Sequence, residues 1–229
     1  MKLDKHFKNG WPETVLFDLD GTLVDSAPDL AIAVDQMLIA LKRAPAGQDN
    51  VRQWVGNGAA VLVRRALAGR FDHEQAPGVD EVGFNDALDH FFRYYADANG
   101  RQARVYDGVL TFLQALDERS CRLGVVTNKP AAFTRPLLAR MDLADWFPVT
   151  VSGDTLTVRK PDPAPIHHAI EQLGGDPAST LMVGDSVTDI RAARNAGVAV
   201  AAVRYGYNYG EPIDTLGADF VVDSLAELL

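Results

Sequence analysis

The sequence predicts an α/β protein in which a Rossmann-like, doubly wound parallel sheet is interrupted by an all-helical insertion. Short apolar runs such as residues 14–17 (TVLF) and 180–183 (TLMV) contain no alternating polar positions. Such runs are typical of strands that are buried on both faces of a parallel sheet. Segments with helical periodicity alternate with these runs in the second half of the chain, which indicates strand–helix–strand units.

The insertion follows the first predicted strand, and no strand is predicted between Val24 and Arg104. Apolar residues recur there every three or four positions, as on the buried face of a helix. The predicted helices cover residues 28–43, 58–67 and 82–98. Pro45 and Gly47 separate the first of them from the second. The resulting domain limits are 25–104 for the helical domain and 12–24 with 105–229 for the core.

After Tyr106 the pattern changes to alternating strands and helices. The predicted strands cover residues 123–127, 149–151, 180–183, 198–203 and 219–222. The predicted helices cover residues 110–116, 131–141, 165–173 and 189–195. Pro136 predicts a kink in the second of these helices, and Gly197 is a typical stop signal for the last.

Polar residues gather where the predicted strands end. In doubly wound sheets, ligands bind beyond the carboxyl ends of the strands. Four acids, one lysine and one hydroxyl group would converge on that crevice, with an amide beside them. These residues are Asp18, Asp20, Thr127, Asn128, Lys160, Asp185 and Asp189. Each one alone fits a turn, a helix cap or a solvated surface. Their joint position at one sheet edge predicts a functional site.

These residues stand in four motifs that resemble those of the haloacid dehalogenase-superfamily phosphatases, in the same order. The motifs are residues 18–26 (DLDGTLVDS), 126–128 (VTN), 160–163 (KPDP) and 184–186 (GDS) with Asp189. The resemblance covers nearly the whole chain. It implies a Mg²⁺-dependent phosphatase whose helical insertion is the family's cap, which closes over the site and selects the substrate.

The chemistry of the first motif fits this resemblance. A carboxylate that attacks a phosphate monoester needs a cation to offset the repulsion between two anions, and Mg²⁺ prefers oxygen ligands. Asp18 is therefore expected to bind the metal and to attack phosphorus. Asp20 is expected to protonate the leaving alkoxide and then to deprotonate water. The resemblance also implies that the Asp20 carbonyl binds the metal. Because a halide leaves without a proton, Asp20 favours phosphoryl transfer over dehalogenation.

The other motifs complete the expected site. Asp185 is expected to be a metal ligand, and Asp189 to orient the ligands around the metal. Lys160 would offset the negative charge of Asp18 and the phosphoryl oxygens. Thr127 and the backbone at Asn128 would donate hydrogen bonds to the phosphoryl group.

The substrate prediction depends on the insertion. Residues 54–59 (WVGNGA), 62–67 (LVRRAL) and 126–130 (VTNKP) resemble phosphoglycolate phosphatases. Gly56, Asn57 and Gly58 could offer backbone N–H groups to an anion, and Arg65 could bind a carboxylate. The two glycines could equally serve only a tight turn, with Arg65 solvated. The leading hypothesis is a 2-phosphoglycolate phosphatase. The alternatives are a sugar-phosphate phosphatase or a phosphomutase on the same core, and a non-catalytic binding module, which the presence of Asp18, Asp20 and Lys160 disfavours.

Composition restricts the partners of the protein. The 229 residues carry a net charge of −9, which disfavours binding to nucleic acid. No apolar run approaches the ~18 residues of a membrane span. The N-terminal residues lack a signal-peptide core, and Cys121 is the only cysteine, which fits a cytoplasmic protein. We expect a monomer or weak homodimer that binds a small phosphate monoester.

Overall fold

The computed structural model describes residues 3, 6–72 and 81–229. The strands are β1 (Thr14–Phe17), β2 (Val24–Asp25), β3 (Arg104–Val105), β4 (Arg122–Val126), β5 (Val149–Val151), β6 (Thr180–Gly184), β7 (Ala199–Val203) and β8 (Phe220–Val222). The α-helices are α1 (Ala27–Ala40), α2 (Gln48–Trp54), α3 (Ala59–Ala68), α4 (Glu81–Ala98), α5 (Val109–Asp117), α6 (Ala131–Arg140), α7 (Ala164–Leu173) and α8 (Val187–Ala196). Short 3₁₀ helices are η3 (Ala144–Trp146), η4 (Pro177–Ser179), η5 (Asn208–Gly210) and η6 (Leu225–Leu228).

The main sheet of the described residues has six strands in the order β5–β4–β1–β6–β7–β8, and every neighbouring pair is parallel. Phe17 of β1 is level with Val125 of β4 and with Val183 of β6. The carboxyl ends of these three strands therefore meet at one edge, and the residues that follow them are brought together.

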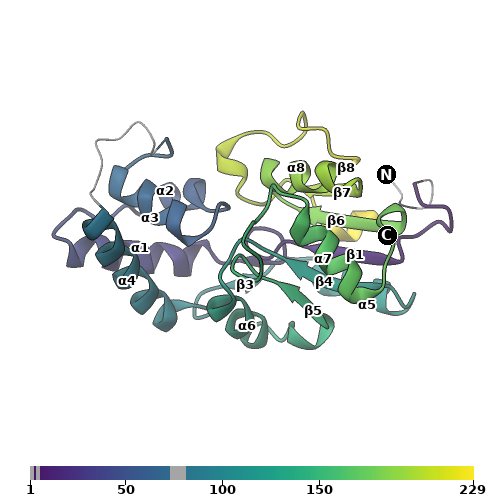
Figure 1. The fold of residues 1–229 in the computed structure, drawn as a ribbon, viewed down its shortest axis with the longest axis horizontal. Coiled ribbons are helices and arrows are strands. Elements are labelled where there is room, and N and C mark those ends of the chain that lie inside the picture. The colour runs from purple at the N-terminus through teal and green to yellow at the C-terminus, as the bar shows by residue number, and fades with distance from the viewer. Residues whose placement is uncertain (1–2, 4–5, 73–80) are drawn as a thin grey trace.

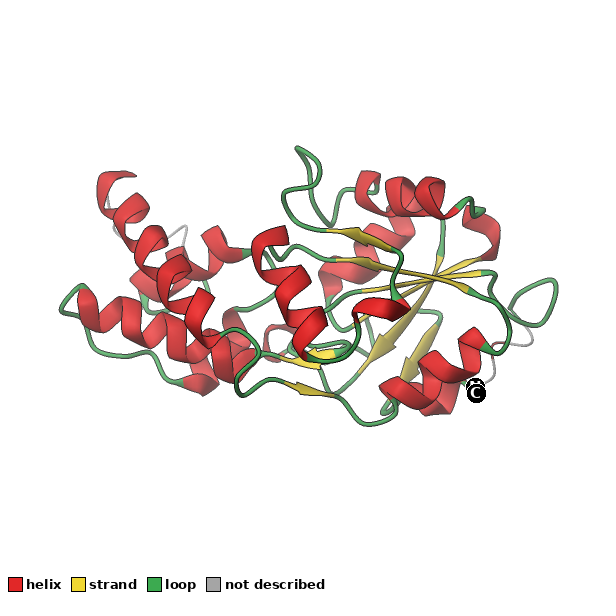
Figure 2. Ribbon diagram, turned by 90° about the horizontal axis from the view of Figure 1, so that it is seen from below, coloured by secondary structure: helices red, strands yellow, loops and turns green. Residues whose placement is uncertain are grey.

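Helices lie on both sides of this sheet, as Figure 2 shows. Val15 and Phe17 are fully buried in the cluster that includes α5 and part of α6, whereas Leu16 is buried in the cluster of α7 and α8. Successive residues of β1 thus point to opposite, equally apolar faces. This arrangement confirms the predicted doubly wound parallel sheet with inserted helices.

Helices α1–α4, called the helical cap below, pack together at one end of the molecule (Figure 1). Their shared core includes Val34, Trp54, Leu62 and Phe91. At the base of the cap, β2 and β3 form a two-stranded antiparallel pair at the points where the chain enters and leaves it. The proposed limits 25–104, 12–24 and 105–229 stay a prediction, and residues 73–80 lie outside the described part.

Several predicted boundaries shift by a few residues. The first helix ends at Ala40, three residues early, and α8 begins at Val187, two residues before the predicted start. Helix α2 was not predicted, because its sequence QDNVRQW is short and buries only Val51 and Trp54. Within the described residues, no helix combines the length and the apolar character needed to cross a membrane.

Candidate active site at the carboxyl edge of the sheet

Asp18 directly follows β1, and its side chain is buried beside a lysine. Lys160 Nζ lies 2.9 Å from Oδ1 of Asp18 and 2.7 Å from Oδ1 of Asp189. Burial by itself would lower the pKa of Lys160, but the two carboxylates raise this pKa above its ordinary value. Lys160 therefore stays an ammonium and holds two acids that are distant in sequence.

Asp185 follows β6 and accepts hydrogen bonds from uncharged donors. Its Oδ1 accepts a hydrogen bond from Thr22 Oγ1 and its Oδ2 one from the backbone N–H of Tyr207, each at 2.8 Å. The backbone of Gly21 passes very close, because a Cβ added there would lie 2.4 Å from Asp185 Oδ2. The φ angle of Gly21 is also +88°, which side-chain-bearing residues rarely adopt.

Carboxylate oxygens of Asp18, Asp185 and Asp189 lie within 4.8 Å of one another. Three carboxylates and the ammonium of Lys160 leave two uncompensated negative charges if all are ionised. Burial raises the pKa of Asp18 to about 6, although the charge of Lys160 opposes this shift. Burial, followed by the charges of Asp189 and Asp18, raises the pKa of Asp185 well above its usual range. An uncompensated buried charge is costly, so this cluster fits a divalent cation bound by oxygen ligands.

Asp189 also caps the helix that carries it. Its Oδ2 accepts hydrogen bonds from Ser186 Oγ at 2.6 Å and from the Ser186 backbone N–H at 3.1 Å. Asp189 is therefore a helix-capping residue, as its position near the start of a predicted helix suggested. Its other oxygen, Oδ1, binds Lys160. One carboxylate thus fixes both the start of α8 and the position of the lysine.

Asp20 has different partners from the acidic cluster. Lys129 Nζ lies 3.0 Å and 3.3 Å from its two carboxylate oxygens, and Ser26 Oγ donates a hydrogen bond of 2.5 Å to Oδ1. Ser26 immediately precedes α1, so Asp20 contacts the start of the helical cap. The two aspartates of the first motif are thus held in two separate environments.

Thr127 and Asn128 follow β4 and lie at the same edge. The side-chain amide of Asn128 donates to the backbone carbonyls of Lys160, at 3.0 Å, and of Gly56, at 3.2 Å. Asn128 therefore ties the lysine loop to the loop between α2 and α3. The hydroxyl oxygen of Thr127 accepts a hydrogen bond from the backbone N–H of Lys129 at 3.2 Å.

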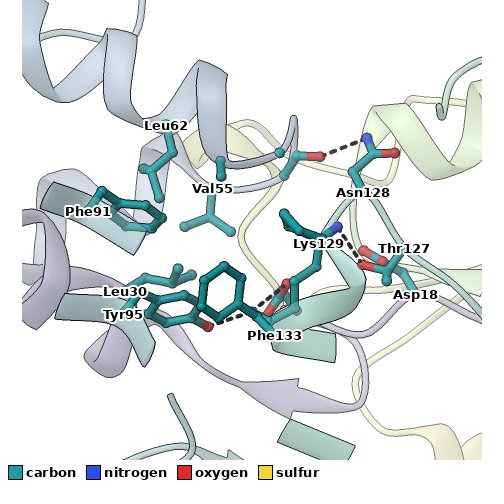
Figure 3. Close-up of a pocket in the computed structure, with 15 residues that line it drawn as sticks. Asp18, Leu30, Val55, Leu62, Phe91, Tyr95, Thr127, Asn128, Lys129 and Phe133 are labelled. Carbon is teal, nitrogen blue, oxygen red and sulfur yellow. Dashed lines mark hydrogen bonds and ion pairs between the residues drawn. The ribbon is translucent and has the colours of Figure 1, made fainter. Parts of the chain in front are cut away.

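A cavity of about 40 Å³ lies between the strand ends and the helical cap. Apolar side chains face polar ones across it, as Figure 3 shows. The apolar side is lined by Leu30, Val55, Leu62, Phe91 and Phe133. The polar side is lined by Asp18, Asp20, Thr127, Asn128 and Lys129. Gly56 and Gly58, which the sequence suggests as substrate-binding residues, also line the cavity.

Arg65 and Asn57, which the sequence suggests as substrate-binding residues, are not among the residues that line this cavity, and that role stays a prediction. The Arg65 guanidinium is buried and donates to the carbonyls of Trp54 and Phe71 and to Oδ1 of Asn57. Three of its five N–H groups are thus used inside the helical cap. Arg65 stabilises the loop that Asn57 belongs to.

Five residues at the site have no role predicted from the sequence. They are Thr22, Ser26, Tyr95, Lys129 and Tyr207. Thr22 and Ser26 belong to the first motif, and Lys129 directly follows Asn128. Their positions in the sequence could therefore have indicated that they lie at the site. Tyr95 and Tyr207 come from α4 and from the loop after β7. No local pattern distinguishes them from core aromatics.

Comparison with known proteins agrees with this geometry. The model of the haloacid dehalogenase-like hydrolases matches residues 12–197. "Phosphoglycolate phosphatase 1" of Pseudomonas aeruginosa is 47% identical over 223 residues, which cover 97% of this chain and 80% of the relative. The "Phosphoglycolate phosphatase" of Colwellia psychrerythraea is 44% identical and covers 95% of both chains.

Among solved structures, the chain resembles a crystal structure described as a predicted phosphoglycolate phosphatase from Haemophilus somnus 129pt. The TM-score is 0.87 at 36% identity, and the match covers 94% of this chain and 96% of the other. The family model spans well over half of the chain, and its four motifs meet at one sheet edge. On this basis the protein belongs to the haloacid dehalogenase-like hydrolases.

Proposed function

We propose that the protein is a Mg²⁺-dependent phosphatase that hydrolyses 2-phosphoglycolate to glycolate and phosphate. The observation that carries this proposal is the separate placement of two aspartates from one motif. Asp18 lies in the buried acidic cluster with Lys160, and Asp20 lies at the cavity with Lys129. A nucleophile beside a metal site and an acid–base group beside the leaving group are what phosphate ester hydrolysis requires.

Asp18 and Asp185 would hold the metal, together with the Asp20 carbonyl, with Asp189 orienting this set. When bound, Mg²⁺ would supply positive charge that offsets the repulsion between carboxylate and phosphoryl oxygens. The two uncompensated charges of the cluster support a divalent ion.

In the first step, a carboxylate oxygen of Asp18 forms a bond to phosphorus while the bond from phosphorus to the ester oxygen breaks. Asp20 transfers its proton to the departing alkoxide, which leaves as an alcohol. Lys160 offsets the charge that develops at Asp18, and Thr127 with the backbone at Asn128 donates hydrogen bonds to phosphoryl oxygens. The product of this step is an aspartyl-phosphate.

In the second step, Asp20, now a carboxylate, takes a proton from a water molecule as the water oxygen bonds to phosphorus. The bond between phosphorus and Asp18 breaks, which releases phosphate and restores the Asp18 carboxylate. The proton on Asp20 is thereby restored for the next cycle.

Two observations support 2-phosphoglycolate as the substrate. Relatives at 44–47% identity carry the name phosphoglycolate phosphatase and align over nearly the whole chain. The cavity between the strand ends and the helical cap is also small, with a volume of about 40 Å³. A two-carbon acid suits such a space better than a sugar does.

The test is kcat/KM for a panel of phosphate esters, with Mg²⁺ and with EDTA. The panel holds 2-phosphoglycolate, a hexose phosphate, a sugar bisphosphate and p-nitrophenyl phosphate. We expect the highest kcat/KM for 2-phosphoglycolate and no turnover in EDTA. A higher value for the hexose phosphate would favour a sugar-phosphate phosphatase. Recovery of an isomeric sugar phosphate instead of inorganic phosphate would favour a phosphomutase.

A further inference from the structure

The cavity must hold a second anionic group besides the phosphoryl group if the proposed substrate is correct. The carboxylate of 2-phosphoglycolate would be enclosed together with the ester once the substrate is bound. An unpaired buried carboxylate is costly, so a cation or several donors must face it. Arg65, the candidate that the sequence suggested, is held by carbonyls within the helical cap.

Among the described residues that line the cavity, Lys129 is the only cation. Its side chain is buried, with 3% of the side-chain surface exposed. The ammonium binds the Asp20 carboxylate and the hydroxyl group of Tyr95, from α4 of the helical cap. Lys160, the other buried lysine of the site, lies between Asp18 and Asp189 instead.

An ammonium has three N–H groups. One direction from Lys129 Nζ leads to the two oxygens of Asp20 and another to Tyr95. Within the described part of the chain, Nζ has no further acceptor. Because the two oxygens of one carboxylate can share an N–H group, one N–H group is available for a ligand in the cavity. Burial is the main cause that raises the pKa of the Tyr95 hydroxyl group. Tyr95 therefore stays neutral and adds no negative charge beside the ammonium of Lys129.

The covalent structure of the substrate places its carboxylate within reach of this N–H group. The ester oxygen that Asp20 protonates and the nearest carboxylate oxygen are joined by two carbon atoms, so they lie roughly 3 Å apart. Lys129 Nζ lies 3.0 Å from the Asp20 oxygen. A substrate whose ester oxygen faces Asp20 can therefore turn its carboxylate toward Lys129 and reach hydrogen-bond distance.

We propose that Lys129 is the residue that selects a carboxylate next to the phosphate ester, which rests on the proposed function. Its ammonium binds the substrate carboxylate while Tyr95 and Asp20 hold the side chain in place. The helical cap contributes the apolar wall of Leu30, Val55, Leu62 and Phe91, which strengthens this ion pair by excluding water.

The test compares two esters of equal length, 2-phosphoglycolate and 2-hydroxyethyl phosphate, which ends in a neutral hydroxyl group. The variants are Lys129→Gln and Lys129→Met, which remove the charge, and Lys129→Arg, which keeps it. Lys42→Gln is the matched control, because Lys42 is an exposed lysine outside the cavity. Using two charge-removing variants keeps the test decisive if one of them folds poorly.

We expect the charge-removing variants to lower the preference for 2-phosphoglycolate over 2-hydroxyethyl phosphate by about 10²-fold, mainly through KM. Lys129→Arg should recover part of that loss, and Lys42→Gln should show none. Any effect that Lys129 exerts through Asp20 alone would lower activity on both esters equally and leave this ratio unchanged.

An unchanged ratio in Lys129→Gln and Lys129→Met would overturn the inference while leaving the proposed function standing. A wild-type enzyme with no preference for 2-phosphoglycolate over 2-hydroxyethyl phosphate would overturn both. A second readout needs no turnover. In the Asp18→Asn background, Lys129→Gln should weaken 2-phosphoglycolate binding, measured by calorimetry, by a similar factor.

Discussion

The hydroxyl group of Tyr207 donates a hydrogen bond of 2.8 Å to Oδ1 of Asp25. The hydroxyl oxygen of Tyr207 in turn accepts hydrogen bonds from the backbone N–H groups of Ser26 and Ala27, at 2.8 Å and 2.9 Å. One side chain from the loop after β7 therefore satisfies the first backbone donors of α1. This contact joins the sheet to the helical cap beside Ser26, which binds Asp20.

The Tyr207→Phe variant should be less stable than the wild type by about 2 kcal/mol, because two buried N–H groups lose their acceptor. The free energy of unfolding, measured with urea, checks this value. Tyr94→Phe is the control, since Tyr94 is only partly buried on α4. Equal stability of Tyr207→Phe and wild type would mean that water replaces the hydroxyl group.

The Asp18→Asn variant should lose at least about 10³-fold in kcat, because the amide is a very poor nucleophile. Acid quenching with ³²P-labelled substrate should trap phosphate on the wild-type protein and none on the variant. The matched control is Asp117→Asn at the exposed end of α5, which should keep full activity. Substantial turnover by pure Asp18→Asn protein would contradict the assignment of the nucleophile.

The stability of the metal-free protein should fall as pH rises from about 4 to 7. Burial raises the pKa of Asp18 to about 6 in the folded state, above that of an unfolded aspartate. The folded protein thus binds more protons in this range, so a contribution of at most about 3 kcal/mol, present below pH 4, is lost as pH passes through 6. Thermal melting in EDTA would measure this loss.

Asp18→Asn has no group to titrate at this position and should melt at a more constant temperature across the same pH range. Mg²⁺ should raise the melting temperature of the wild type more at pH 7.5 than at pH 5, because protons compete for the same carboxylates. A Mg²⁺ effect that is independent of pH would argue against binding by Asp18 and Asp185.

The Arg65→Ala variant should be destabilised by about 3 kcal/mol or more, because three buried hydrogen bonds of the guanidinium are lost. Arg64→Ala is a closely matched control. Arg64 is 39% exposed and pairs with an exposed glutamate, Glu81, so its loss should cost at most about 1 kcal/mol. Where Arg65→Ala remains folded, its selectivity between 2-phosphoglycolate and 2-hydroxyethyl phosphate should stay that of the wild type. A loss of selectivity would indicate that Arg65 binds the substrate carboxylate.

The Gly21→Ala variant should lose about 10²-fold or more in kcat, because the new Cβ would displace the Asp185 carboxylate. Gly174→Ala separates this effect from backbone strain. Gly174 also has a positive φ, of +62°, but a Cβ there would meet no atom within 4 Å. Its variant should lose about 1 kcal/mol of stability and no activity. Equal kinetic losses in both variants would show that strain alone is responsible.

The sequence was sufficient to predict the sheet and the polar edge. Runs such as TVLF and TLMV are apolar at every position, which is compatible with a strand only when helices cover both faces. Parallel strands end at the same edge, so Asp18, Thr127 and Asp185 had to lie near one another. These two predictions require only that the strands run in the same direction and that both faces of the sheet are buried. Helix α2 was missed because two buried residues in seven define no periodicity.

Only the tertiary structure distinguished Lys129 from Arg65. Both are cations beside a polar motif, and both side chains are buried. Which acceptors each cation meets depends on segments far away in sequence, because Lys129 reaches Asp20 and Tyr95 whereas Arg65 is enclosed by Trp54 and Phe71. A long flexible side chain binds the nearest acceptor that packing offers. Its partner is therefore set by how the helical cap lies against the sheet, which no local pattern encodes.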